Sequence, residues 1–474
     1  MKILFAASEA WPFAGTGGLA DVAGALPKAL RERLVGCRVV MPLYECVPQE
    51  LRENMTLIAT LTVPVAWRRQ YCGVFEAHVG GVIYYLLDNQ YYFKREGLYG
   101  HFDDAERFAF FSRAVLEMIG HIDYLPDIIH SNDWQCALIP VYHKLFYKDQ
   151  PEFAKIRHVF TIHNIQYQGK YGMEILGDVF GIPNKNKSLV EQDRYINLMK
   201  GGIEAADLVT TVSPTYAQEI MDPWFAHGLD GILRMRSGKV RGILNGIDTV
   251  SYNPATDKEL FASFSTEDMT GKAVNKKELQ KRLGLAEKPE APLVAMVSRL
   301  VAHKGMDLVQ YALDEFLQGD VQVAVLGSGE WVYEQFFGEM KRKYPDKCAF
   351  VGGFIPELAR KLYAGADIFL MPSKSEPCGL SQMVACRYGT VPVVRETGGL
   401  KDSIADVGDG GMGFTFKTYN AGDMLGALRR ATGAYADKAE WPVLVGRAMR
   451  TDFSWGRSAN EYKKLYRGLI GTVA

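Results

Sequence analysis

Two cations follow a short apolar run in the second half of the chain. Arg299 and Lys304 lie five residues apart in the segment S-R-L-V-A-H-K-G (298–305), directly after Leu293–Val297. If that run is a strand, a planar guanidinium and a point-like ammonium at its carboxyl end can hold a diphosphate from two sides. The pair predicts an anion-binding site, with two solvated surface cations as the alternative.

Three segments carry glycine at a predicted helix start or after a predicted strand, where free backbone N–H groups attract anions. These segments are G-T-G-G-L-A-D (15–21), P-S-K-S-E-P-C-G-L (372–380) and E-T-G-G-L (396–400), the last predicted to form a second anion nest. The first also reads as the dinucleotide fingerprint G-x-G-x-x-A, but residues 8–14 separate it from the strand that the fingerprint should follow directly. In the second, Glu376 can accept hydrogen bonds from sugar hydroxyls. Cys378 has no base beside it and is expected to be a small buried side chain.

Amides and aromatic rings follow two predicted strands of the first half. N-D-W-Q (132–135) comes after a strand that ends at His130, and H-N-I-Q-Y-Q-G (163–169) comes after the strand 159–162. This composition is typical of carbohydrate sites and favours a functional role for His163 over a structural one. The sequence contains no H-E-x-x-H motif, Cys/His cluster or Asp-rich calcium loop, so we expect neither a metal nor a cofactor.

Short apolar strands alternate with helical segments along the chain. The predicted helices include 19–33, 104–119 and 135–147, and the predicted strands are 3–7, 37–41, 82–87, 127–130, 159–162, 208–211, 293–297, 321–326, 349–351, 367–371 and 391–394. Near-continuous apolar strands between helices indicate parallel sheets covered on both faces. The sequence therefore predicts an α/β protein of two doubly wound, Rossmann-like domains facing a deep cleft, where the carboxyl ends of the strands gather ligands.

A polar segment, 253–292, is predicted to separate the two series of strands. It contains the basic run G-K-A-V-N-K-K at 271–277. We expect these lysines to form a solvated helix face, with a phosphate or glycan contact as the alternative.

Composition excludes several classes of protein. The 474 residues contain 54 Lys and Arg against 55 Asp and Glu, and this net charge of −1 argues against a nucleic-acid partner. No apolar run approaches the roughly 18 to 20 residues of a membrane helix, and Glu9 interrupts the opening apolar stretch before a signal peptide forms. Seven cysteines without a C-x-x-C pair favour reduced thiols, so we expect a cytoplasmic protein.

Taken together, these motifs resemble those of bacterial glycogen synthases and plant starch synthases over essentially the whole chain. The motifs that carry the resemblance are T-G-G-L-A-D-V (16–22), N-D-W-Q (132–135), H-N-I-Q-Y-Q-G (163–169), N-G-I-D (245–248), S-R-L…H-K-G (298–305), S-E-P-C-G-L (375–380), R-Y-G-T-V-P (387–392), T-G-G-L (397–400) and D-F-S-W (452–455). The resemblance implies the two-domain GT-B fold. It places an acceptor-side domain at 1–245, a nucleotide-sugar domain at 246–452, and a C-terminal helix at 453–474 that returns to the first domain.

The resemblance implies a retaining glucosyltransferase that moves glucose from ADP-glucose to the non-reducing end of an α-1,4-glucan such as glycogen. The implied catalytic residues are His163, Glu376, Arg299, Lys304 and Asp21. The implied donor-binding residues are Gly15, Gly17, Gly18, Asn245, Phe354, Cys378, Gly379, Leu380, Thr397, Gly398 and Gly399. The implied acceptor or sugar residues are Tyr99, Asp133 and Trp134.

Two positions depart from the family's pattern. Phe354 stands where a tyrosine usually faces the adenine, and Gly15 stands where the first motif usually has a lysine. The missing cation leaves the choice between ADP- and UDP-glucose open, and we expect Gly15→Lys to lower the donor KM if the loop tolerates a side chain. A glucan-binding paralogue of low or no activity, and a nicotinamide oxidoreductase, remain alternatives, and the oligomeric state is not predicted.

Overall fold

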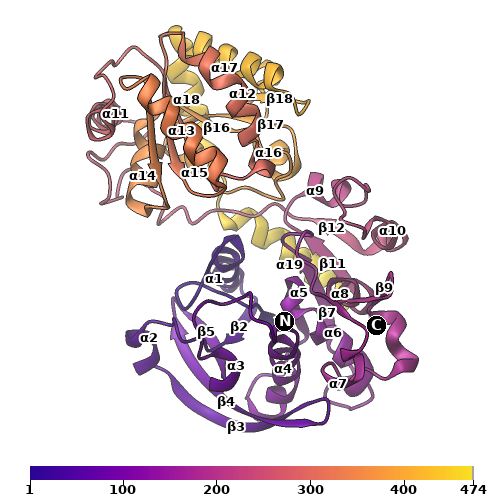
Figure 1. Ribbon diagram of the computed structural model, residues 1–474. Coiled ribbons are helices and arrows are strands. Elements are labelled where there is room, and N and C mark those ends of the chain that lie inside the picture. The colour runs from indigo at the N-terminus through magenta and orange to yellow at the C-terminus, as the bar shows by residue number, and fades with distance from the viewer. Residues whose placement is uncertain (472–474) are drawn as a thin grey trace. The chain divides into compact units, whose positions relative to one another are not determined.

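The computed structural model describes residues 1–471, which form two compact units (Figure 1). The first unit contains Met1–Asn245 together with the helix α19 (Trp455–Gly471), and the second contains Gly246–Ser454. Within residues 1–471, no helix is long and apolar enough to cross a membrane.

A nine-stranded sheet forms the centre of the first unit, in the order β12-β11-β7-β6-β1-β2-β5-β4-β3. Its parallel strands are β1 (Lys2–Ala6), β2 (Gly36–Pro42), β5 (Val82–Asp88), β6 (Ile128–Asn132), β7 (Arg157–Ile162), β11 (Leu208–Thr211) and β12 (Val240–Gly242). The chain winds in one direction from β1 through β2 to β5, and in the other direction from β6 onward. The predicted doubly wound arrangement is therefore confirmed here, and its switch point lies between β1 and β6.

An antiparallel hairpin at one edge of this sheet was not predicted. It consists of β3 (Thr56–Val65) and β4 (Arg68–Val79), which pair from Thr56 with Glu76 to Val65 with Arg68. Along β3, buried residues occur only in its second half, where Leu61, Val63 and Val65 alternate with more exposed neighbours. A search for near-continuous apolar runs misses such a strand, because a sheet edge with one solvated face needs apolar residues only at alternate positions.

Helices pack on the first sheet, and loops connect them to its strands. The helices are α1 (Gly18–Arg31), α2 (Gln49–Glu53), α3 (Gln90–Phe93), α4 (Asp104–Glu117), α5 (Asp133–Cys136), α6 (Leu138–Tyr142), α7 (Ile175–Asp178), α8 (Leu198–Ala205), α9 (Pro214–Glu219) and α10 (Asp230–Met235). The continuous helix predicted at 135–147 is instead α5, α6 and a π-helical turn (His143–Tyr147). Pro140 lies within this segment and has no N–H to donate, which is consistent with the interrupted helix. A small sheet of β8 (Lys170–Gly172), β10 (Tyr195–Asn197) and β9 (Glu191–Gln192) lies beside them.

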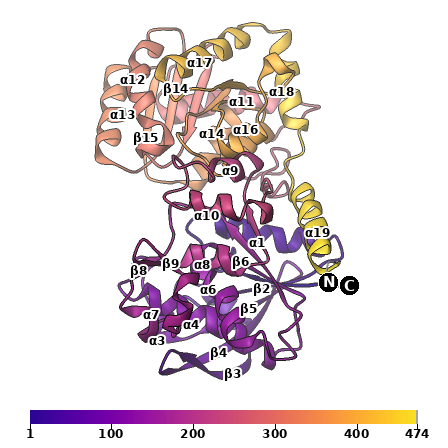
Figure 2. The same ribbon diagram turned by 90° about the vertical axis from the view of Figure 1, so that its right-hand side faces the viewer.

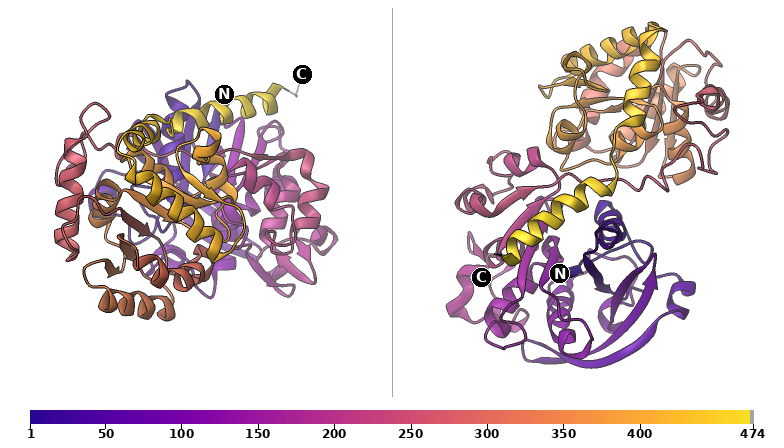
Figure 3. Two further views of the ribbon diagram at one scale, coloured as in Figure 1. Left: turned by 90° about the horizontal axis from the view of Figure 1, so that it is seen from above. Right: turned by 180° about the vertical axis from the view of Figure 1, so that it is seen from behind.

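The last described helix, α19, packs on the first unit and contacts α1 (Figure 3). The hydroxyl of Tyr466 is 2.6 Å from Nδ1 of the buried His130 in β6, and the Ser458 hydroxyl donates to the Leu244 carbonyl. The chain therefore leaves the first unit after Asn245 and re-enters it at Trp455.

The second unit has a fully parallel six-stranded sheet with helices on both faces (Figure 2). Its order is β15-β14-β13-β16-β17-β18, formed by β13 (Leu293–Val297), β14 (Gln322–Gly327), β15 (Cys348–Gly352), β16 (Ile368–Met371), β17 (Val391–Arg395) and β18 (Phe414–Phe416). Its helices are α11 (Thr270–Leu283), α12 (Met306–Leu317), α13 (Trp331–Lys343), α14 (Pro356–Gly365), α15 (Ser381–Arg387), α16 (Gly398–Ser403), α17 (Ala421–Ala436) and α18 (Glu440–Arg450). This is the Rossmann strand order, with the switch point between β13 and β16.

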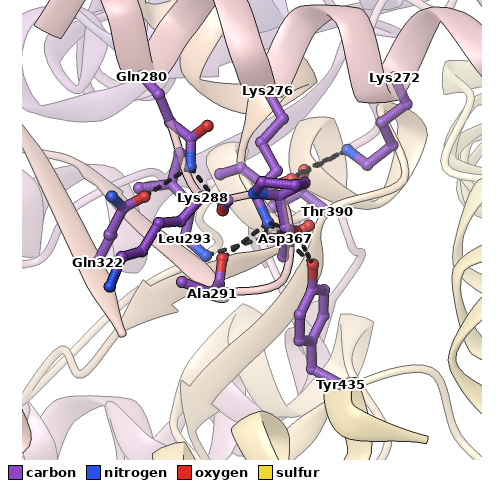
Figure 4. A network of polar contacts seen from close by, with 12 residues as sticks. Lys272, Lys276, Gln280, Lys288, Ala291, Leu293, Gln322, Asp367, Thr390 and Tyr435 are labelled. Atoms are coloured by element: carbon purple, nitrogen blue, oxygen red, sulfur yellow. Dashed lines mark hydrogen bonds and ion pairs between the residues drawn. The ribbon is translucent and has the colours of Figure 1, made fainter. Parts of the chain in front are cut away.

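The predicted linker 253–292 belongs to the second unit, and its basic run lies on α11 (Figure 4). Lys272 Nζ has four acceptor oxygens within 3.0 Å, from the loops that precede β16 and β17. Lys276 Nζ lies 2.7 Å from an Asp367 carboxylate oxygen that also accepts from the Leu293 amide. For these two lysines, the predicted solvated face and its phosphate-binding alternative are both wrong. Their ammonium groups hold together the amino ends of the strands, the edge opposite the ligand-binding loops.

Candidate active site

Two of the predicted residues meet at the switch point of the second sheet. Lys304 ends a short turn after β13, and Glu376 lies in the loop after β16. Lys304 Nζ is 2.6 Å from Oε2 of Glu376, and the Ser373 hydroxyl donates to the same oxygen at 3.1 Å. The carboxylate is buried, with Glu376 only 6% exposed. From the sequence we expected Lys304 to bind the diphosphate and Glu376 to bind the sugar, whereas the structure joins them in one ion pair.

Arg299 follows β13 and is exposed, in contrast to Lys304. The pKa of His303, in the same loop, is lowered by burial and then by the positive charges of Lys304 and Arg299. Two cations and a neutral imidazole thus surround the carboxyl end of β13. This region can attract the charge of a phosphate.

Close packing of two loops explains the glycines at 398 and 399. A Cβ on Gly398, whose φ is +43°, would lie 1.9 Å from the Glu376 carbonyl oxygen, and one on Gly399 would lie 2.2 Å from that of Cys378. The Gly399 amide donates to the Glu376 carbonyl at 3.1 Å. Because this amide is already used within the chain, the expected anion nest at 396–400 is not supported at Gly399. The glycines instead let α16 support the loop that carries Glu376.

The remaining predicted donor residues lie on loops after β15, β16 and β17. Phe354 follows β15 and is 71% exposed, so its ring is open for stacking. Cys378 is buried, as expected, and Leu380 is half-buried. Gly379 has φ +72°, where other residues are strained, and Thr397 is fully buried at the start of α16.

The carboxyl edge of the first sheet brings His163 and Asp133 together. The His163 amide donates to Asp133 Oδ1 at 2.7 Å, and its ring Nε2 lies 2.9 Å from Oδ1 of Asn132. The other end of that Asn132 amide donates to the Ala6 carbonyl, which fixes the carbonyl oxygen toward His163. Burial lowers the pKa of His163 to about 3. The ring is therefore neutral at pH 7, with its proton on Nε2 and a free lone pair on Nδ1.

Asp133 is held in an unusual backbone conformation. Its φ is +56°, which is uncommon for a residue with a side chain and is often found at functional sites. Burial raises the pKa of its carboxyl group to about 7, against the opposing effect of hydrogen bonds from the His163 and Asn164 amides. The group is therefore able to gain or lose a proton near neutral pH.

This raised pKa predicts a pH dependence of stability. The folded Asp133 binds a proton that the unfolded residue, with a pKa of about 3.9, has released, so the free energy of unfolding should fall as pH rises from about 4 to 7. One such group contributes at most about 1.4 kcal/mol per pH unit. We expect Asp133→Asn, which also tolerates positive φ, to flatten this slope in urea titrations at pH 4.5, 5.5, 6.5 and 7.5. An unchanged slope would contradict the protonated carboxyl.

Glu9 is a site residue that the sequence analysis missed. It follows β1, is 3% exposed and accepts hydrogen bonds from the Thr16 amide at 2.9 Å and the Thr16 hydroxyl at 2.7 Å. It thereby anchors the glycine-rich loop that precedes α1, where Asp21 lies in the first turn. The available signal was an acidic residue three positions after the buried strand β1.

Glycine occurs at different positions of this loop for different structural reasons. A Cβ on Gly15 would lie 2.4 Å from Ala20 Cβ and 2.8 Å from the Trp11 ring, so Gly15 is needed for packing. A Cβ on Gly17 or Gly18 would meet no atom of the described residues within 4 Å, and neither has a positive φ. The chain itself does not require glycine at these two positions. A ligand that approaches the backbone closely would require it.

Aromatic residues line the same edge of the first sheet. The Tyr99 hydroxyl is 2.7 Å from the hydroxyl of Ser8, and its ring packs on Phe108, which contacts Trp134 at 5.2 Å between centroids. Asn245, the last residue of the first unit before the crossing, has a buried Oδ1 without a hydrogen-bond partner in the described part of the chain. This oxygen is available to accept a hydrogen bond from water or from a ligand.

The structure thus assembles two sets of predicted residues at the carboxyl edges of two sheets. Lys304 and Glu376 meet in the second unit, and His163, Asp133, Tyr99 and Trp134 are connected in the first. Among residues 1–471, no group of three His, Cys, Asp or Glu side chains is placed to hold a metal ion.

Fold and site together define a glycosyltransferase. Residues 2–235 match the family description "Starch synthase catalytic domain", and residues 275–434 match "Glycosyl transferases group 1". The sucrose-phosphate synthase of Thermosynechococcus elongatus, at 17% identity and a TM-score of 0.62 over 99% of both chains, shares the two-domain GT-B fold.

Comparison with individual proteins narrows this class. The chain is 49% identical to the glycogen synthase of Geobacillus thermodenitrificans (strain NG80-2), over 99% of this chain and 98% of that one. It is 48% identical to the glycogen synthase of Bacillus cereus (strain ATCC 10987 / NRS 248), over 99% and 100%. The catalytic domain of starch synthase IV from Arabidopsis thaliana, bound to ADP and acarbose, has a TM-score of 0.91 and 35% identity over 99% of both chains. The chain belongs to the glycogen and starch synthase family and is a glucosyltransferase.

This assignment confirms the family predicted from the motifs. It also excludes the nicotinamide oxidoreductase that the fingerprint at Gly15–Ala20 had left open. A nucleotide sugar and a glucan are the substrates that the family uses.

Proposed function

We propose that the chain transfers glucose from ADP-glucose to the non-reducing end of an α-1,4-glucan, with retention of configuration. The observation that carries the proposal is the ion pair between Lys304 and the buried Glu376 carboxylate, beside the exposed Arg299, at the switch point of the second sheet. The starch synthase IV neighbour is bound to ADP, the nucleotide that this reaction would release. The reduced state of all seven cysteines fits a cytoplasmic enzyme.

The roles of the site residues follow from where negative charge develops during the reaction. As the bond between glucose C1 and the β-phosphate breaks, negative charge grows on the departing oxygen, and preorganised cations stabilise it. Arg299 is free to take the diphosphate, while Lys304 can bridge the phosphate and Glu376. Glu376 would accept hydrogen bonds from the glucose hydroxyls, and the Nδ1 lone pair of His163 would accept another.

The acceptor glucan supplies the attacking oxygen and the proton that the leaving phosphate takes up. Its terminal hydroxyl oxygen forms the new bond to C1 on the face from which ADP leaves, and its proton passes to the departing phosphate oxygen. The sequence shows no carboxylate pair of the kind that retaining hydrolases use, so we favour this same-face reaction over a covalent intermediate. The open space at Gly17 and Gly18 supports a close approach of the donor to that loop.

One assay tests the function directly. Purified protein is incubated with glycogen and either ADP-glucose or UDP-glucose, and nucleotide release is measured with and without glycogen. We expect glycogen-dependent release of ADP, with slower release of UDP. Retention on a glycogen-containing gel without release of either nucleotide would instead support the glucan-binding paralogue.

Metal removal should have little effect. The described residues offer no three-ligand cluster, and the charge on the leaving group is met by side-chain cations. We expect the rate in EDTA to stay within about a factor of two of the untreated rate. A loss of activity that Mg²⁺ or Mn²⁺ restores would contradict this expectation.

A further inference from the structure

We propose that Trp67, together with Arg68 and Asp178, is a second glucan-binding site that stacks on a glucose unit of the acceptor chain away from the catalytic centre. The inference rests on the proposed function in taking an α-glucan as the ligand. Trp67 is the second residue of the two-residue turn between β3 and β4, and its side chain is 71% exposed.

Contacts on several sides hold the exposed indole in place. Its Nε1 donates to Asp178 Oδ1 at 2.7 Å, and the Arg68 guanidinium carbon lies 4.5 Å from the ring centroid. Arg68 is fixed in turn by Asp178 at 3.2 Å and by Glu106 of α4 at 3.3 Å. A ring that is already ordered loses little side-chain entropy when a ligand covers it, which makes this surface suited to binding.

The turn that presents Trp67 is itself constrained. Ala66 has φ +52°, an uncommon conformation for a residue with a Cβ. The loop after α7 supports it, because a Cβ on Gly181 would lie 3.1 Å from Ala66 Cα. A two-residue hairpin turn favours positive φ at its first position, so these contacts fix the direction in which the turn presents Trp67.

The chemistry of this surface fits a sugar. The C–H faces of a glucose ring pack on the electron-rich face of an indole, and its hydroxyl rim needs hydrogen-bonding groups beside the ring. Asp178, with 56% of its side chain exposed, and Arg68 supply an acceptor and a donor next to Trp67. Hydrogen bonds from Trp67 and Arg68 lower the pKa of Asp178, which keeps the carboxylate ionised. An apolar ligand would displace water from Asp178 and Arg68 without replacing the hydrogen bonds that the water makes.

The position of the turn connects it to the candidate active site. Gly73 of β4 pairs with Asp88, the last residue of β5, so the strand extends five residues further to Arg68, beyond the carboxyl edge of the sheet. His163 and Asp133 follow β7 and β6 at that same edge. Glu106, which binds Arg68, is on the same helix, α4, as Phe108, which contacts Trp134. In Figure 1 the ends of β3 and β4 lie beside α7, where Asp178 is found. The turn that presents Trp67 therefore lies at the same edge of the first sheet as the predicted acceptor residues.

The test compares long and short acceptors in the full-length protein. Trp67→Ala should weaken retention on glycogen-containing native gels by about three- to tenfold, the size of one aromatic contact. The ratio of the KM for glycogen to the KM for maltotriose should rise by a similar factor. Trp67→Phe, which keeps a stacking ring, should retain most of the affinity. Tyr311→Ala removes a matched aromatic that is 83% exposed on α12 and should leave retention unchanged.

Each other outcome overturns the proposal. Unchanged glycogen retention in a folded Trp67→Ala protein would show that the ring binds no glucan. An equal loss with maltotriose and glycogen would show that the substitution acts through the catalytic centre. A lower sedimenting mass of Trp67→Ala would show that the surface joins copies of the chain. Gel retention needs no glucosyl transfer. This test of glucan binding at Trp67 is therefore independent of the test of the proposed reaction.

Discussion

Replacing Arg299 by alanine is expected to lower kcat by about 100-fold or more. The guanidinium is exposed and free to meet the leaving diphosphate, so its removal should cost transition-state stabilisation of roughly 3 kcal/mol. Because Arg299→Ala leaves no buried charge unpaired, the thermal unfolding midpoint should not change. Steady-state kinetics with saturating glycogen measures the effect on kcat.

Lys304→Ala should lower kcat at least as strongly, but with an added loss of stability. It leaves the carboxylate of Glu376 buried without its cation, and breaking a buried pair typically costs about 3–5 kcal/mol. Adding Glu376→Gln should recover stability without recovering activity. Lys281→Ala, which removes an exposed cation from the last turn of α11, serves as the control and should change neither quantity. Near-wild-type turnover in both single variants would refute the assignment of the two cations.

The second large effect is expected at Gly15, and its direction is the reverse of what the sequence suggests. Restoring the family's lysine should add a phosphate contact, but the side chain has no room. A Cβ at this position would lie 2.4 Å from Ala20 and 2.8 Å from the Trp11 ring. The φ of Gly15 is not in the left-handed region, so the obstacle is packing rather than backbone strain. Gly15→Ala and Gly15→Lys should therefore both displace the loop.

We expect either substitution to raise the KM for ADP-glucose about tenfold and to lower the free energy of unfolding by about 1–3 kcal/mol, the usual cost of overpacking. Gly17→Ala is the matched variant, because its Cβ meets no described atom. It should leave stability unchanged and raise the donor KM only if the nucleotide sugar lies against that backbone. Kinetics with both nucleotide sugars and urea unfolding separate these cases. A Gly15→Lys protein with full stability and a lower donor KM would show that the loop rearranges freely.

The sequence could predict the features that local pattern encodes. Buried strands such as β13 and β16 are almost continuously apolar, and their alternation with helices indicates a parallel, doubly wound sheet. In such a sheet the loops at the carboxyl ends meet, so Arg299, Lys304 and Glu376 could be assigned to one site from their positions after those strands. The hairpin of β3 and β4 escaped this reasoning, because an edge strand has a solvated face and a weaker apolar pattern.

Other properties depended on contacts between residues far apart in the chain. Only the tertiary structure pairs Lys304 with Glu376, seventy-two positions later, and buries Lys272 and Lys276 among carbonyl oxygens that precede three strands. It also decides that Gly15 is packed while Gly17 is open, although both stand in one short glycine-rich run. By itself, the sequence determined the fold class and the family, because these follow from periodicity and motif order. The ionisation of Asp133, the room at Gly15 and the partners of the lysines were decided by the tertiary structure, because burial and steric fit depend on which distant atoms fold against each group.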